Sequence, residues 1–218
     1  NRQISRVAYG DETETLASVL ARISESWKFT WRNMVDFLEQ DGLKLAQMGN
    51  PTDRKALLDE LEKLVKIEEP AVYQQAAQEL ETIQQELYAA VSHLPVGRRG
   101  KIRAYLIAVQ GMILLQKIGA VLADFIALME AQGKEPAEDQ AVQSDINMEN
   151  DIKRIPEHQE TENAHREEQW NLAEDLEYWL YDYKKLWRSV SKEAELHRIE
   201  HVICQYADWL RVFDKICD

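Results

Sequence analysis

The stretch 104-AYLIAVQGMILLQKIGAVLADFIALM-129 is long and apolar, and its place in the fold decides the class of protein. It has 26 residues and carries two charges, on Lys117 and Asp124. Four polar residues in and just before it are seven positions apart: Arg103, Gln110, Lys117 and Asp124. Seven residues of α-helix return to within about 20° of the same direction. The spacing therefore predicts a helix that other helices surround, with one narrow polar edge reaching water.

A membrane helix is the alternative for this stretch. Its longest uncharged run, Ala104–Gln116, has 13 residues, whereas a spanning helix needs roughly 18. Lys117 lies at the centre, where Lys or Asp costs roughly 2.5–3.5 kcal/mol and each Leu, Ile, Val or Phe returns only about 0.3–0.6 kcal/mol. We therefore expect the central helix of a soluble bundle. The alternative is a bundle that opens and releases residues 104–129 into a bilayer.

The composition favours few, long elements. The chain has 218 residues, of which 45% are hydrophobic, with only 8 Gly and 5 Pro, and an all-β protein needs more turn residues. Residues 1–10 lack the apolar segment of a signal peptide, and the missing initial Met leaves open a fragment or a processed product.

Cys204 and Cys217 fall in one predicted helix, roughly 20 Å apart, which is too far for a disulfide. We expect a reducing, cytoplasmic setting, with an intermolecular bond as the alternative.

The net charge of −13 is concentrated in the last third of the chain. Residues 1–132 carry 15 basic and 18 acidic groups, a net charge of −3, and residues 133–218 carry 11 and 21, a net charge of −10. Such a chain repels phosphate backbones, so we expect no nucleic-acid binding. A protein partner with a basic surface fits this charge better.

The first predicted helix begins near Asp11, which has capping-box spacing to Glu14. Its apolar stripe advances in steps of three and four through Leu16, Leu20, Ile23, Trp27, Trp31, Met34 and Leu38. These residues share one face of a helix. The helix is expected to end at 41-DG-42 or to continue to Met48.

Prolines mark the next helix starts. Asn50 and Pro51 suit the N-cap and the first helical position, and Pro70 begins another apolar stripe that stops at 94-LP-95. With the central helix, these segments predict an antiparallel bundle of about four helices in residues 1–132.

Residues 133–160 are polar and acidic and have no sustained apolar period. They predict a long acidic connector, which could serve as a regulated or cleavable tether. Residues 161–218 hold two stripes with the 4-3 spacing of coiled-coil packing. Because the join at 188-RSVS-191 is short, the two helices should form an antiparallel hairpin. The predicted fold class is all-α: an antiparallel helical bundle plus a C-terminal helical hairpin, joined by the connector.

The inventory of catalytic motifs is empty. The chain has no Gly-x-Ser-x-Gly, no His-Glu-x-x-His and no nucleotide-binding glycine loop, so we expect no enzymatic activity and no cofactor. His197 and His201 have metal-ligand spacing together with Cys204 and Asp208. They face away from the hairpin seam, and a solvated histidine pair is the commoner explanation.

Aromatic residues are abundant on the predicted hairpin. Tyr178, Tyr181 and Trp209 lie off the seam between its helices, and aromatics are enriched at interaction hot spots. Packing of these residues on the N-terminal bundle is the commoner explanation. Arg98 and Arg99 belong to the densest basic patch, at which the acidic connector or a partner could dock.

The sequence thus favours a non-enzymatic module, an adaptor or a regulatory or inhibitory subunit, that binds a partner protein through acidic and aromatic helix surfaces. The alternatives are the membrane-active protein described above and a metal-binding helical protein. No feature of the sequence indicates a small-molecule ligand.

Overall fold

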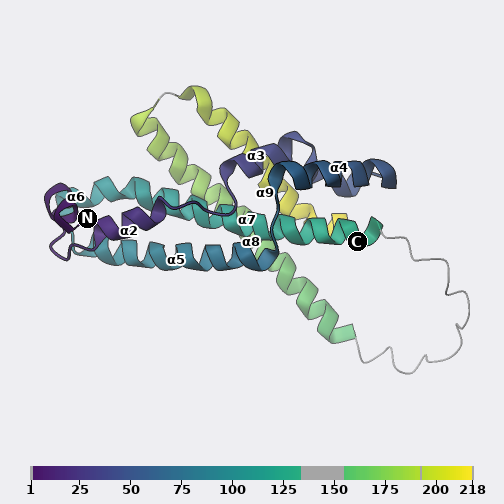
Figure 1. The fold of residues 1–218 in the computed structure, drawn as a ribbon, viewed down its shortest axis with the longest axis horizontal. Coiled ribbons are helices and arrows are strands. Elements are labelled where there is room, and N and C mark those ends of the chain that lie inside the picture. The colour runs from purple at the N-terminus through teal and green to yellow at the C-terminus, as the bar shows by residue number, and fades with distance from the viewer. Residues whose placement is uncertain (1, 134–154, 192, 218) are drawn as a thin grey trace, which may run out of the picture.

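The computed structural model describes residues 2–133, 155–191 and 193–217, and within these residues the chain is all-α without a strand (Figure 1). The predicted fold class is confirmed. The elements are α1 (Arg2–Ile4), the π-helical turn η1 (Ser5–Tyr9), α2 (Leu16–Ile23), α3 (Trp31–Glu39), η2 (Gly42–Gln47), α4 (Pro51–Val65), α5 (Pro70–Ser92), α6 (Val96–Arg99), η3 (Gly100–Ile102), α7 (Arg103–Gly133), α8 (Ile155–Val190), η5 (Glu193–Glu195) and α9 (Leu196–Cys217).

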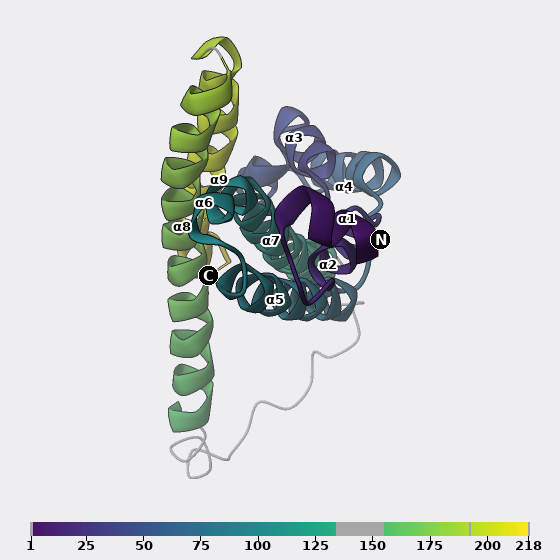
Figure 2. The same ribbon diagram turned by 90° about the vertical axis from the view of Figure 1, so that its left-hand side faces the viewer.

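Helix α7, which contains the apolar stretch 104–129, is the centre of the molecule. Helix α5 runs beside it, α8 crosses it, and α4 packs against it (Figures 1 and 2). Its core residues are buried: Ile107, Val109, Ile113, Leu114, Ile118, Leu122, Phe125 and Met129. By length and composition, Val96–Ala131 is the one helical run of the described residues that could span a membrane, and more than half of its most apolar window is buried inside the protein. The prediction of a buried central helix is confirmed.

The predicted polar edge of α7 is also confirmed. Its residues are exposed or half-buried. Among their polar contacts are those of Arg103 with Asp182 (3.6 Å), Lys117 with Glu81 (3.0 Å) and Gln110 with Gln84 (2.6 Å). The charges of the apolar stretch are therefore placed at the rim of the bundle, where water reaches them.

The prediction of one helix from Asp11 to Leu38 is wrong. The chain leaves helix after Ile23 and resumes at Trp31. Between them, the side chain of Gln116, fully buried in α7, accepts the backbone N–H of Phe29 at 3.0 Å and donates to its carbonyl at 2.7 Å. These two hydrogen bonds give the N–H and carbonyl of Phe29 the partners that a helix would otherwise supply. The apolar stripe gave no sign of the break because α2 and α3 each bury an apolar face, although in two different hydrophobic clusters.

Two further features fix this break. The side chain of Phe29 packs where Gly119 has no Cβ, since a Cβ there would lie 2.9 Å from the Phe29 Cβ. Helix α3 then starts with a capping box: the Thr30 hydroxyl accepts the N–H of Asn33, and the Asn33 side chain accepts the N–H of Thr30 at 2.9 Å. A capping box satisfies two backbone N–H groups at the start of a helix and so marks where α3 begins.

The predicted capping box at Asp11 is corrected. Helix α2 begins five residues later, at Leu16, and Glu14 has a left-handed backbone with φ of 57°. The Asp11 carboxylate nevertheless caps α2 from a distance, because it accepts the N–H of Leu16 at 2.8 Å and that of Thr13 at 3.0 Å. Burial alone would raise the pKa of Asp11, but these hydrogen bonds and one from the Thr13 hydroxyl outweigh it, and the pKa is lowered.

Replacing Asp11 by asparagine is expected to lower the free energy of unfolding at neutral pH by about 1 kcal/mol, as loss of a helix cap does. The lowered pKa stabilises the fold above the unfolded-state value of about 3.9, and this contribution is lost as pH falls through the folded-state pKa. Urea unfolding of both proteins should therefore show a gap that closes below about pH 4. The Glu12→Gln variant, at an exposed neighbour, controls for the lost charge. A gap that persists in acid would contradict the assignment.

The antiparallel hairpin of α8 and α9 packs on the N-terminal helices. Trp179 fits against Gly111 of α7, where an added Cβ would lie 2.8 Å from the indole, and its Nε1–H donates to the Ile107 carbonyl at 2.8 Å. The buried Tyr206 of α9 donates its hydroxyl to the Met34 carbonyl at 2.8 Å. Burial raises the pKa of Tyr206, so this hydroxyl keeps its proton.

Helices α3, α4, α7, α8 and α9 consequently share one hydrophobic core. Helix α8 begins at Ile155, six residues before the predicted start of the hairpin. Most of the predicted acidic connector, residues 134–154, lies outside the described residues. The division into residues 1–132, 133–160 and 161–218 stays a prediction.

Candidate interaction surface

Helix α8 presents exposed aromatic rings on the side that faces away from α7. Trp170, Tyr178 and Tyr181 are 48%, 72% and 60% exposed. With two charged residues they form a stripe in steps of four, four, three and four, which we name the α8 outer face: Trp170, Glu174, Tyr178, Tyr181 and Lys185. Such steps place residues on one side of a helix. The opposite side holds Leu172, Leu176 and Leu180, which are buried.

Cations already lie over two of these rings. The Lys185 ammonium is 3.9 Å from the centre of the Tyr181 ring, and the Arg211 guanidinium is 5.6 Å from that of Trp170. The Trp170 indole also donates to Glu174 at 3.3 Å. The face of an aromatic ring carries partial negative charge and therefore attracts a cation placed over it. The α8 outer face is therefore suited to Lys and Arg side chains.

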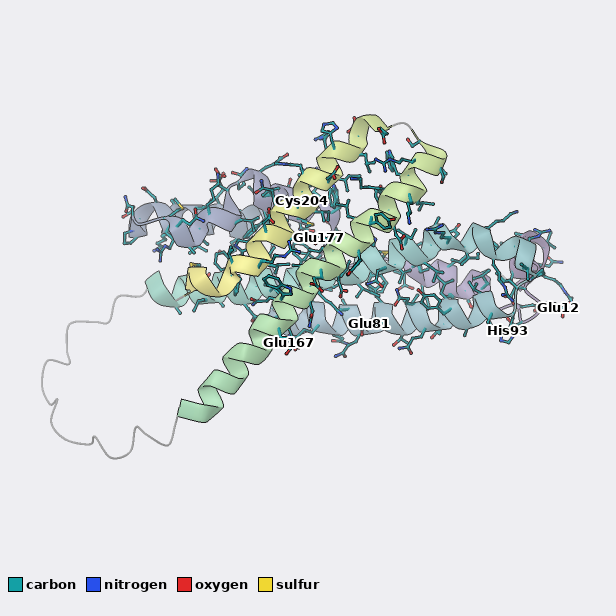
Figure 3. The ribbon with its side chains drawn as sticks, turned by 180° about the vertical axis from the view of Figure 1, so that it is seen from behind. Glu12, Glu81, His93, Glu167, Glu177 and Cys204 are labelled. Carbon is teal, nitrogen blue, oxygen red and sulfur yellow. The ribbon has the colours of Figure 1, made fainter. Side chains whose placement is uncertain are left out.

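The charge of this part of α8 is uniformly negative. Residues 167–183 contain no Lys or Arg and six carboxylates: Glu167, Glu168, Glu174, Asp175, Glu177 and Asp182. Glu177 forms a two-pronged ion pair with Arg211 of α9, at 2.8 and 2.7 Å, and these hydrogen bonds lower the pKa of Glu177. Figure 3 shows Glu167 and Glu177 along the same helix. The surface is thus both acidic and aromatic.

Of the three predicted partner-binding aromatics, the structure leaves two exposed. Tyr178 and Tyr181 lie on the α8 outer face, whereas Trp209 is buried, with 5% of its surface exposed. Its ring packs edge-to-face on Phe125 of α7 at 5.2 Å and on Phe213 at 4.8 Å. The prediction that Trp209 faces a partner is corrected, because α7 covers the off-seam side of α9 at this point.

Arg98 and Arg99 belong to another surface. Both are exposed at the end of the bundle near α6. Arg98 donates to the Ala8 carbonyl at 2.8 Å, and Arg99 donates to the Leu94 and Ser92 carbonyls, each at 3.0 Å. The Ser92 carbonyl ends α5 and that of Leu94 lies two residues beyond it, at a helix C-terminus that a cation stabilises. These arginines therefore do not extend the α8 outer face.

The histidines proposed as weak metal candidates, His197 and His201, are exposed on α9, as is Cys204 (Figure 3). No group of three or more His, Cys, Asp or Glu side chains in the described part of the chain is arranged to hold a metal ion. Burial, with the charges of Glu200 and Asp208, raises the pKa of the Cys204 thiol. The raised pKa favours the thiol over the nucleophilic thiolate.

Trp170 was not among the predicted site residues. The signal was present in the sequence, because the spacing from Trp170 to Lys185 repeats in threes and fours. It was hidden by the stronger apolar stripe on the opposite side of the same helix.

Comparison with protein-family models, with curated proteins and with solved structures found no match.

Proposed function

We propose that the protein is a non-enzymatic interaction module that binds a partner protein through the α8 outer face. The observation that carries this proposal is the exposure of Tyr178 and Tyr181 on a helix whose opposite side is already packed. Tyrosine is enriched at interface hot spots, since it offers a large apolar area and a polar tip. These two rings therefore contribute little to the core of the described chain.

The charges of the α8 outer face and its surroundings indicate the kind of partner that would bind. The carboxylates of residues 167–183 attract a basic surface, and the rings of Trp170 and Tyr181 already hold cations. A partner helix or extended segment with Lys or Arg beside an apolar residue would match both properties. The protein would act as an adaptor or a regulatory subunit, and its cytoplasmic location stays a prediction.

Release of α7 into a bilayer is supported only by the length and apolarity of that helix. Release would withdraw Trp179 from Gly111 and break the two bonds that Gln116 makes to Phe29. A metal-binding function rests only on the spacing of His197 and His201, since no cluster of metal-ligating side chains forms among the described residues. We therefore favour the interaction module.

The test is affinity capture from the native lysate with the purified chain as bait. We expect wild type to capture one stoichiometric partner. The Tyr178→Ala/Tyr181→Ala variant should recover at least about thirtyfold less of this partner, because hot-spot residues contribute about 2 kcal/mol or more to binding. Recovery should also fall with salt. Tyr88→Ala is the control, because Tyr88 is also an exposed tyrosine, at 56%, but lies on α5. Equal recovery by all three baits, with unchanged circular dichroism, would reject the α8 outer face as the binding site.

A further inference from the structure

One end of the bundle is chemically unlike the rest of this acidic protein. It is formed by residues 3–10 and 95–105, which Figure 2 views end-on around the labels N and α6. The two segments touch: Arg98 donates to the Ala8 carbonyl at 2.8 Å, and Pro95 lies against Gly10. We name these two segments the basic end.

The basic end carries an excess of positive charge, which carboxylates of neighbouring elements compensate only in part. It contains no Asp or Glu and five basic residues: Arg6, Arg98, Arg99, Lys101 and Arg103. Arg6 and Arg103 have carboxylates at 4.0 and 3.6 Å, from neighbouring elements. The other three form no ion pair with any carboxylate of the described residues. In a chain of net charge −13, this is a local reversal of sign.

The same end exposes aliphatic side chains. Val96 and Val7, at 79% and 77%, are the two most exposed large apolar residues of the described chain, and Ile4 is 55% exposed. Single exposed aliphatic residues are ordinary. Three of them at one end, beside three cations that lack a carboxylate partner among the described residues, are a combination that a bilayer interface accommodates. The apolar groups enter the bilayer while the cations stay at the headgroups.

We infer that the basic end docks the folded protein on an anionic lipid surface. The aliphatic residues favour lipid over a nucleic acid, which would use the cations but leave the valines in water. A protein partner would need a hollow that fits the exposed aliphatic residues, whereas a bilayer accommodates them without one. Helix α7 stays packed in this arrangement, so docking differs from insertion. Contact through one end also leaves the α8 outer face accessible to a partner.

The test is flotation of the full chain with vesicles of phosphatidylcholine alone or mixed with phosphatidylserine. Wild type should float only with the mixed vesicles, less so as salt rises. Lys101→Glu should lower the partition coefficient at least about fivefold, as removal of one basic contact does. Val7→Ser/Val96→Ser should lower it about tenfold through lost apolar burial. Dye-loaded vesicles should not leak, since α7 remains inside the bundle.

The controls match each change at sites away from the basic end. Lys63→Glu on α4 changes the net charge equally. Leu64→Ser/Val212→Ser removes two exposed aliphatic side chains, on α4 and α9. Both should float as wild type does.

Absence of flotation, or equal losses in test and control variants, would overturn the inference. Leakage would assign membrane binding to α7 instead. Binding to polyglutamate that Lys101→Glu weakens, without flotation, would assign the basic end to an acidic protein.

Discussion

Replacing Trp209 by alanine is expected to lower the free energy of unfolding by about 2–4 kcal/mol. Truncation of a buried tryptophan costs about 3–5 kcal/mol, and this ring packs edge-to-face on both Phe125 and Phe213. The indole N–H has no hydrogen-bond partner in the described structure, and removal of an unsatisfied donor offsets about 1 kcal/mol or more of that cost. For a chain of this size, the midpoint of thermal unfolding should fall by roughly 5–15 °C.

Two variants separate this role from a surface role. Tyr178→Ala removes an exposed ring and should change the free energy of unfolding by no more than about 0.5 kcal/mol. Trp209→Phe keeps much of the ring contact, removes the unpaired donor, and should cost less than Trp209→Ala. Urea unfolding followed by circular dichroism measures all three. If Trp209→Ala were as stable as Tyr178→Ala, the burial of Trp209 against α7 would be refuted.

The second large effect is expected at Gln116. Leucine has a similar volume to glutamine, so Gln116→Leu leaves little cavity. The substitution removes both hydrogen bonds to Phe29, and the buried N–H and carbonyl of Phe29 lose their partner. Each buried backbone group without a partner costs about 1–3 kcal/mol. The expected loss of stability is therefore about 2–6 kcal/mol. The segment between α2 and α3 should also become more sensitive to proteolysis, because the two bonds hold it on α7.

Gln110→Leu is the matched control for this variant. Gln110 lies on the same helix but is half-buried, and it accepts one hydrogen bond, from Gln84, at 2.6 Å. Its replacement should cost about 1 kcal/mol or less, as loss of a partly exposed hydrogen bond does. If the two variants unfolded at the same urea concentration, the bonds from Gln116 to Phe29 would contribute nothing specific.

The sequence predicted helices where local chemistry specifies them. Asn50 accepts the N–H of Thr52 at 3.0 Å and Pro51 opens α4, as their residue types indicate. Pro70 opens α5 in the same way. These signals are local because a cap or a fixed φ acts within one turn of the helix. The break between α2 and α3 escaped prediction because the side chain that holds it, on Gln116, is 87 residues from Phe29 along the chain.

For the candidate surface, the sequence identified the residue types but could not select among them. Tyr178 and Trp209 were both predicted to lie off the hairpin seam, yet one is exposed and the other is buried. A helical wheel gives the direction of a side chain about its own axis. Whether a third helix lies in that direction depends on how the hairpin crosses α7.

The sequence by itself determined the all-α class, the long central helix and its polar edge, because a period of 3.6 residues and a spacing of seven are properties of one chain segment. The tertiary structure alone decided which aromatic rings meet water, which arginines lack a carboxylate, and where the first helix breaks. Each of those outcomes depends on a neighbour from a distant part of the chain: Phe125 beneath Trp209, Ala8 beside Arg98, and Gln116 beside Phe29.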